Sequence, residues 1–289
     1  ALVMIVFDST TKFKIREISK LSPFAFRLAM VFFVINAVGL TFFTHLFFSH
    51  PLRWTTASIM ISALFGIMMS GTSPSTILTM LKEKREDIVK ILEFESIVNT
   101  PLIVIIPLFI ISWYFGEIAT GELFLSFIRG VMAGVGTGFV IGIVLSKIMK
   151  KRYFPSLSPI AIIALALVSY TLAENIGGNG VLSVTTLGVV FGWAILKEKE
   201  KMEEFIGIFT NFLTIVIFIL LGLFIKIPTN ITFLLKSILL FGLFIVLRYF
   251  AVRIVSRKTK LKLREKLFMT FSISKGIGEA VVALSLIHI

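Results

Sequence analysis

The sequence predicts an all-α fold, a polytopic transmembrane helical bundle, and three observations support this prediction. First, 57% of the 289 residues are hydrophobic and the mean hydropathy is +0.99, whereas a soluble domain is about 45–50% apolar. Second, the apolar residues form runs of about 18 or more, enough to cross a hydrocarbon core of roughly 30 Å. Third, basic residues alternate between successive connections. Helices are expected because backbone groups must pair internally in lipid.

The apolar runs predict one partial span and nine fuller ones. The partial span is 1–7, and the others are 24–48, 54–81, 88–114, 123–148, 157–173, 178–196, 205–226, 231–254 and 267–289. Both ends of the sequence lie inside apolar runs, and neither has the pattern of a signal peptide. We therefore expect a transporter-like chain that is truncated at both ends.

Lysine and arginine are concentrated in every second connection between these spans. The connections rich in basic residues are 12–20, 82–90, 147–152, 197–201 and 253–266. The positive-inside rule places these loops in the cytoplasm of a multi-pass cell-membrane protein. The net charge of +13 is therefore a topology signal, and no nucleic-acid partner is expected. Attraction to anionic lipid headgroups is an expected side effect.

Composition and motifs also argue against several other classes of function. The chain has no cysteine, which excludes disulfides and thiolate metal sites, and its three histidines lack metal-ligand spacing. The hydrolase patterns HExxH and GxSxG are absent. We therefore expect neither an enzyme nor a bound cofactor.

A first polar cluster, Gly71-Thr72-Ser73-Pro74, interrupts the span 54–81. Thr72 lies nine residues before Leu81, which is about 13 Å from the cytoplasmic end at 1.5 Å per residue. Proline disrupts a helix, and a helix broken near the midplane exposes carbonyls and amides that suit an ion site. The alternative is a proline kink in which Ser73 and Thr72 bond back to carbonyls.

The second cluster is the stretch ILEFESIVNTPLIV, residues 91–104. Glu95, Ser96, Asn99 and Thr100 share one broad helix face that reaches the midplane. Glu93 is expected at the interface, where it complements the helix dipole. For Glu95, the alternative to a transport role is a carboxylate in a structural salt bridge.

The third cluster, SISKGIGE at residues 272–279, lies in the last span. Lys275 is nine residues from Lys266, so its depth matches that of Thr72 in a span that runs the opposite way. Two antiparallel discontinuous helices broken at equal depth are typical of inverted-repeat transporters. Glu279 is one turn beyond Lys275 and within reach of an ion pair. Lys275 is expected either to handle protons or to be a structural cation.

The remaining polar residues of the spans are interpreted as structural. Asp8 is expected to mark a membrane exit. The arginines near span ends are expected to snorkel, and they are Arg27, Arg129 and Arg248. Glu174-Asn175 and the glycines after them are interpreted as an outer re-entry turn.

Four of these segments resemble motifs of the monovalent cation:proton antiporters of the archaeal NhaP type. Thr72-Ser73-Pro74 resembles the family's TDP break, and residues 95–100, ESIVNT, resemble its ESxxND motif. FILLGLFI at 218–225 resembles its FxFLG helix, and Ser274-Lys275-Gly276 resembles its PRG segment. The motifs occur in order over nearly the whole chain.

The resemblance implies one exchanger domain over 1–289 with the NhaA/NhaP-like inverted-repeat fold. Its mobile core bundle would be 24–114 and 231–289, and 123–226 would be linker and scaffold helices that form a homodimer. Thr72, Ser96 and Asn99 would be ligands of a monovalent cation. Glu95 and Lys275 would form the buried pair that corresponds to the family's Glu–Arg pair.

The sequence departs from the family at two positions, because Ser73 and Thr100 stand where the family has aspartates. A hydroxyl can coordinate a hard cation but supplies no negative charge. Our first hypothesis is an antiporter that exchanges Na⁺ or K⁺ for protons by alternating access, with coupling through Glu95, Lys275 and Glu279. The alternatives are a transport-inactive or regulatory homologue, and a cation uniporter or channel.

Overall fold

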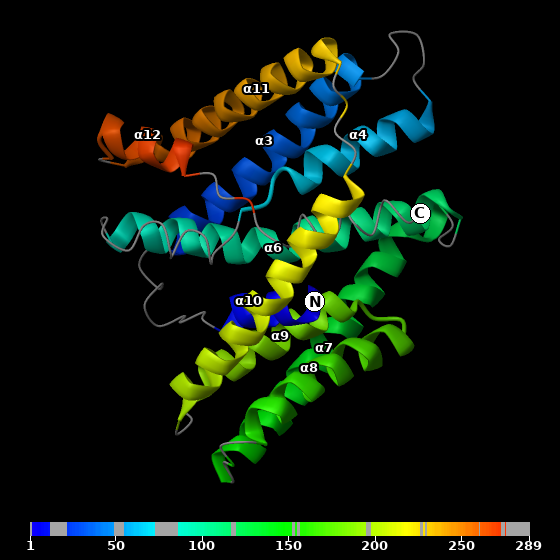
Figure 1. The fold of residues 1–289 in the computed structure, drawn as a ribbon, viewed down its shortest axis with the longest axis vertical. Helices are drawn as coiled ribbons and strands as arrows, with labels where there is room; N and C mark the ends of the chain where they lie inside the picture. Colours follow the sequence, from blue (N-terminus) through cyan, green and yellow to red (C-terminus); the bar gives the residue numbers. More distant parts are fainter. Residues whose placement is uncertain are drawn as a thin grey trace. The chain divides into compact units, whose positions relative to one another are not determined.

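The structure is a computed structural model of the chain. It describes residues 2–11, 22–48, 55–72, 86–116, 120–151, 154, 157–194, 198–225, 228, 230–259, 261–272 and 275. Every element of regular structure in these residues is helical, as predicted (Figure 1). Six of the helices are long and apolar enough to cross a membrane.

The described helices follow the predicted spans in order. They are α1 (Leu2–Thr11), α3 (Ser22–Phe48), α4 (Thr56–Met68), α6 (Glu86–Tyr114), α7 (Leu123–Lys151), α8 (Ser158–Asn175), α9 (Gly180–Trp193), α10 (Lys199–Phe224), α11 (Ile231–Val255) and α12 (Leu263–Phe271). There are also two short 3₁₀ helices. η1 (Thr120–Glu122) precedes α7, and η2 (Ser256–Lys258) follows α11.

The chain divides into two compact units. The first unit is 1–17, 111–222 and 283–289, and the second is 18–110 and 223–282. The first unit therefore contains α1, α7, α8, α9 and most of α10. The second contains α3, α4, most of α6, α11 and α12.

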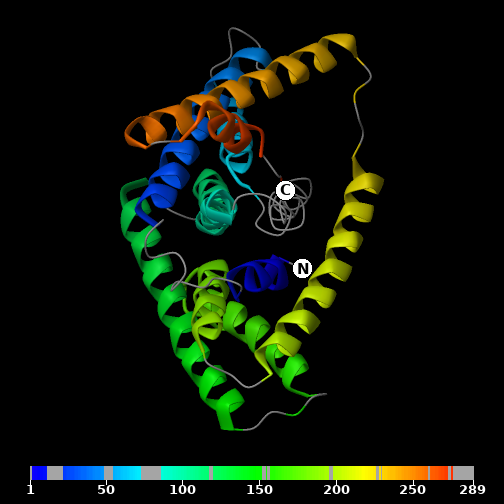
Figure 2. The same cartoon turned by 90° about the vertical axis from the view of Figure 1, so that its left-hand side faces the viewer.

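In the first unit, glycines let helices approach closely around α9. A Cβ added to Gly138 of α7 would lie 2.0 Å from the carbonyl oxygen of Ser183 on α9, and one added to Gly188 of α9 would lie 2.0 Å from the hydroxyl of Thr10 on α1. Glycine recurs on α7 at positions 130, 134, 138 and 142, a small-residue stripe of the kind that packs membrane helices. α9 is therefore held between α1 and α7 (Figures 1 and 2).

A tight turn joins α8 to α9, as the residues around Glu174 predicted. Gly177 has φ +75, a conformation that glycine adopts without strain. The Glu174 carboxylate accepts a hydrogen bond of 2.7 Å from the backbone N–H of Gly180, and the Asn179 side chain caps α9. These bonds pair backbone N–H groups at the start of α9, where no helical partner exists.

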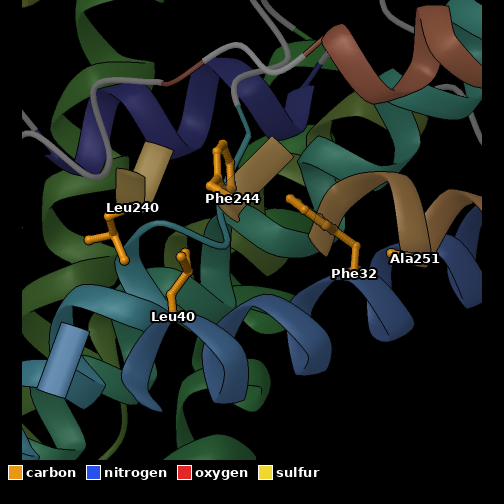
Figure 3. Close-up of a cluster of buried hydrophobic side chains, with 5 residues drawn as sticks. All are labelled: Phe32, Leu40, Leu240, Phe244 and Ala251. Carbon is orange, nitrogen blue, oxygen red and sulfur yellow. The ribbon is translucent and has the colours of Figure 1, made fainter. Parts of the chain in front are cut away.

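The second unit is built on an apolar seam between α3 and α11. Phe32 and Leu40 of α3 meet Leu240, Phe244 and Ala251 of α11, and all five side chains are buried (Figure 3). The α4 helix packs along α3. Close approach there depends on Gly66, whose added Cβ would lie 2.7 Å from the carbonyl oxygen of Ala37.

For both predicted interruptions, the structure confirms that a helix ends just before the polar cluster. α4 ends at Met68, with Met69 as its C-cap, and Gly71 and Thr72 are not helical. α12 ends at Phe271, with Ser272 as its C-cap. The second halves of both predicted spans lie outside the described residues.

Candidate functional site

A buried ion pair joins α6 to α11 within the second unit. The Glu95 and Arg248 side chains are both 0% exposed. Arg248 Nη2 donates to Glu95 Oε2 at 2.7 Å, and Nη1 donates to Oε1. Arg248 also donates from Nε to the carbonyl of Met269 on α12 at 3.3 Å, and its guanidinium carbon lies 4.0 Å from the centroid of the Phe32 ring. One side chain therefore connects four helices.

This geometry corrects two sequence-based expectations. Arg248 does not snorkel, because it is fully buried. The buried partner of Glu95 is Arg248, whereas Lys275 was expected in that position. The Glu95–Lys275 pair was implied by the family resemblance, and the order of motifs along the chain does not specify which helix faces meet. A usable signal was the spacing of Phe244, Arg248 and Ala251, which places Arg248 on the buried face of α11.

Lys275 lies instead at the end of α4. Its ammonium donates to the carbonyl oxygen of Gly71 at 2.8 Å and to that of Met69. It also lies 4.6 Å from the centroid of the Phe244 ring. The last carbonyls of any helix lack intrahelical partners, and here a cation satisfies two carbonyls at such an end.

Hydroxyl groups continue the site from α4 to α6. Ser96 Oγ donates to Thr72 Oγ1 at 2.7 Å, and both residues are buried. Thr100 donates its hydroxyl proton to the carbonyl of Ser96 at 2.7 Å, so the proton is used within α6 and only oxygen lone pairs remain available. Thr100 therefore presents a neutral oxygen.

Asn99 is buried without a hydrogen-bond partner. It is 0% exposed, and neither its amide nitrogen nor its amide oxygen has a partner among the described residues. Pro101 follows in the same helix, and because proline has no N–H, the carbonyl of residue 97 lacks its helical partner. Buried polar groups are normally paired, so this part of α6 is suited to a bound species that supplies the missing contacts.

Asn36 on α3 is a second buried amide without a hydrogen-bond partner among the described residues, and it was not predicted from the sequence. It is 0% exposed and both of its amide atoms are unpaired among the described residues. The available signal was a lone amide in the apolar run 24–48 at helical spacing from Phe32 and Leu40. Two predicted site residues, Ser73 and Glu279, lie outside the described residues.

The remaining predicted residues are placed as follows. Asp8 of α1 is 6% exposed, so it is not a solvent-exposed exit residue. Glu93 is half-buried, and Arg27 and Arg129 are exposed. No group of three His, Cys, Asp or Glu side chains gathers in the described ranges. The site described here consists of carbonyl, hydroxyl and amide oxygens next to one lysine, and oxygen ligands are those that hard cations prefer.

Comparison with known proteins gives consistent matches. The sequence model of the family described as "Sodium/hydrogen exchanger, transmembrane" matches residues 1–287. The chain is 28% identical over 201 residues to the low-affinity Na⁺/H⁺ antiporter NhaS1 of Synechocystis, covering 65% of this chain and 36% of that protein. It is 27% identical over 244 residues to the probable Na⁺/H⁺ antiporter 2 of Methanocaldococcus jannaschii, covering 78% and 57%. The chain thus spans well under two thirds of either relative.

A solved structure shows the same fold. The sodium proton antiporter MjNhaP1 from Methanocaldococcus jannaschii superimposes with a TM-score of 0.83 at 20% sequence identity, covering 99% of this chain and 71% of that one. This likeness confirms the predicted fold class, an all-helical multi-pass bundle with the fold of that structure.

Proposed function

We propose that this chain, which belongs to the family of transmembrane sodium/hydrogen exchangers, exchanges Na⁺ or K⁺ for protons across the cell membrane. Family membership and the antiporters it resembles support this function. By alternating access, the ion site would be exposed to each side of the membrane in turn, as the bundle 24–114 and 231–289 moves against the scaffold 123–226.

The contact of Lys275 with the end of α4 is the observation that carries the proposal. Its ammonium is bound by the carbonyls of Met69 and Gly71, next to Thr72 and its partner Ser96. An ammonium and a small monovalent cation both bind carbonyl oxygens, so the two compete for the same ligands. When the cation binds, Lys275 loses a proton, and when the cation leaves, Lys275 takes one up.

This competition couples cation and proton movement without the family's two aspartates. One positive charge replaces another at the carbonyls, and the released proton leaves toward the side from which the cation came. Thr72, Ser96 and Asn99 complete the cation's oxygen shell in this proposal, and Ser73 and Thr100 add neutral oxygens. Glu279 is proposed as a proton relay beside Lys275.

Glu95 has a positioning role in this proposal. A guanidinium stays protonated in proteins, so the pair with Arg248 is neutral only when Glu95 is ionised. A carboxylate held in this way fixes α6 against α11 and orients Ser96 and Asn99. The proposed proton site therefore moves from Glu95 to Lys275.

Proton flux in proteoliposomes tests the function. The protein with its flanking sequence is reconstituted into vesicles with a proton gradient, and Na⁺ and K⁺ are added separately. We expect one or both cations to dissipate the gradient. Ser96→Ala should raise the cation concentration needed for half-maximal flux. Ser62→Ala is the matched control, because Ser62 is a buried serine that bonds only back along α4.

Three results would contradict the proposal. If neither cation moves protons, the alternative of a transport-inactive homologue gains support. A cation current that is independent of the proton gradient would indicate a uniporter or channel. Equal effects of Ser96→Ala and Ser62→Ala would remove Ser96 from the site.

Sidedness and association are part of the same proposal. The basic loops 12–20, 82–90, 147–152, 197–201 and 253–266 are proposed to face the cytoplasm, and the protein is proposed to be a homodimer in the lipid bilayer. Because the chain has no cysteine, single cysteines report sidedness cleanly. Lys151→Cys should react only from inside and Glu122→Cys only from outside. The mass of the detergent-solubilised protein tests the dimer.

A further inference from the structure

An apolar cavity opens between α3, α4 and α11 in the second unit. Its volume is ≈ 450 Å³, within the range of about 300–1,000 Å³ that is usual for ligand sites. Leu40, Phe65, Phe241 and Phe244 are among its lining residues, and Figure 3 shows Leu40 and Phe244 facing the space between α3 and α11. This cavity is separate from the polar cluster around Ser96.

The length and the opening of the cavity match a lipid chain. Along α11 the lining extends from Phe233 to Phe244, eleven steps or about 16 Å at 1.5 Å per residue. That length is about half of the roughly 30 Å hydrocarbon core, the depth of one leaflet. Two lining side chains are largely exposed, Ile61 at 61% and Phe241 at 59%. Because α3 and α11 are long and apolar enough to cross a membrane, this opening is expected to face hydrocarbon.

Two polar groups distinguish the end of the cavity near the α3 C-terminus. Thr44 lines the cavity, is 8% exposed, and its hydroxyl has no hydrogen-bond partner among the described residues. Lys236 lies between the lining residues Phe233 and Ser237, with its Nζ 5.8 Å from the centroid of the Phe48 ring. Phe48 is the last residue of α3, so this ammonium lies at the depth where lipid headgroups begin.

We infer that this cavity binds one acyl chain of an anionic membrane lipid. The chain fills the apolar space and the Thr44 hydroxyl donates to an oxygen that links the chain to glycerol. The phosphate of the headgroup pairs with Lys236. A buried hydroxyl needs a partner, and a lysine ammonium forms charge-assisted hydrogen bonds with phosphate, so one molecule satisfies both groups.

The cavity shares two lining residues with the surroundings of Lys275. Met69 and Phe244 line the deep part of the cavity, and the same two residues contact the Lys275 ammonium. Occupancy of the cavity therefore holds in place two of the groups that position Lys275. The binding inference does not depend on transport, because the cavity and its polar end exist whatever the protein moves.

Photocrosslinking identifies the occupant. The whole protein is reconstituted into phosphatidylcholine vesicles containing phosphatidylglycerol with a photoactivatable acyl chain, and crosslinked peptides are identified by mass spectrometry. We expect crosslinks on the cavity segments of α3, α4 and α11. Ser237→Phe fills the cavity and should remove most of them. Leu239→Phe, on the exposed side of α11 at 58% exposure, is the matched control and should leave them unchanged.

A second comparison tests the charge. Photoactivatable phosphatidylcholine should label the cavity less than phosphatidylglycerol, and Lys236→Gln should lower this preference by about fivefold. Lys150→Gln, at the far end of α7, should leave the preference unchanged. Equal labelling by both lipids would overturn the anionic assignment. Labelling that survives Ser237→Phe, or protein–protein crosslinks from this face in place of lipid adducts, would overturn the site.

Discussion

Arg248 donates hydrogen bonds from both terminal nitrogens of its guanidinium to the Glu95 carboxylate, and neither side chain is exposed to solvent. The pair joins α11 to α6 at the level of the polar cluster, only one residue before Ser96. Its position makes it a structural support for the candidate site, because any movement of the α6 backbone at Glu95 would also displace Ser96 and Asn99.

Breaking this pair from one side should destabilise the protein strongly. Arg248→Met leaves the Glu95 carboxylate buried and unpaired, which costs about 3–5 kcal/mol. Arg248→Lys keeps the charge but loses the bidentate geometry, so its effect should be smaller. Thermal and denaturant unfolding in detergent measure both changes.

The double variant Glu95→Leu/Arg248→Met separates pairing from packing. Replacing both charges by apolar groups of similar size is often nearly neutral, so the double variant should recover most of the stability that the single variant loses. If the double variant is as unstable as Arg248→Met alone, the loss comes from packing against Phe32 and not from an unpaired carboxylate.

The sequence predicted which helices exist better than it predicted which residues meet. The spans followed from run length and from the alternation of basic loops, two signals that act along the chain and need no tertiary contact. The helix ends at Met68 and Phe271 were also predicted from local signals, namely a proline and polar clusters in the sequence. For such features the sequence is sufficient.

Partner choice inside the bundle could not be predicted in the same way. Lys275 and Arg248 are both cations of predicted spans, and the family resemblance implied Lys275 as the partner of Glu95. The structure pairs Glu95 with Arg248 because that residue lies on the face of α11 turned toward the bundle, while Lys275 bonds to the end of α4. Which face of a helix points into the bundle depends on tertiary packing. Asn36 of α3 is a second example, because its burial was not predicted from the sequence.

The unpaired amide of Asn99 should make the protein less stable than it could be. An unsatisfied buried polar group costs about 1–3 kcal/mol, so Asn99→Leu should raise the unfolding temperature while it lowers cation-dependent proton flux. Asn36→Leu is the matched control, because Asn36 has the same burial and the same lack of partners among the described residues. It should stabilise similarly and keep the flux. Loss of flux in Asn36→Leu would place that amide in the ion site.

The glycines of α7 should be sensitive to substitution only where they face α9. Gly138→Ala would place a methyl group 2.0 Å from the Ser183 carbonyl oxygen, whereas a Cβ on Gly136 meets nothing within 4 Å. Gly136→Ala should stabilise by up to about 1 kcal/mol through helix propensity, and Gly138→Ala should destabilise the protein. Unfolding temperatures of the two purified variants in detergent test this prediction. Equal shifts in unfolding temperature would contradict the close approach of α7 and α9.

The proton role of Lys275 can be separated from its structural role by substituting arginine. Lys275→Arg keeps a cation at the Met69 and Gly71 carbonyls, so the protein should stay folded, but a guanidinium does not release its proton. We expect unfolding temperatures close to wild type and loss of cation-dependent proton flux in proteoliposomes. Lys147→Arg, an exposed lysine near the end of α7, is the control and should retain flux.

Two introduced carboxylates complete this test. If Lys275 carries the proton because positions 73 and 100 hold no carboxylate, then Ser73→Asp and Thr100→Asp together should return flux to the Lys275→Arg protein. The new carboxylates supply both the negative charge and the titratable group that the arginine lacks. Undiminished flux in Lys275→Arg alone would show that the proton travels through another residue, and the proposed competition at the α4 carbonyls would then be wrong.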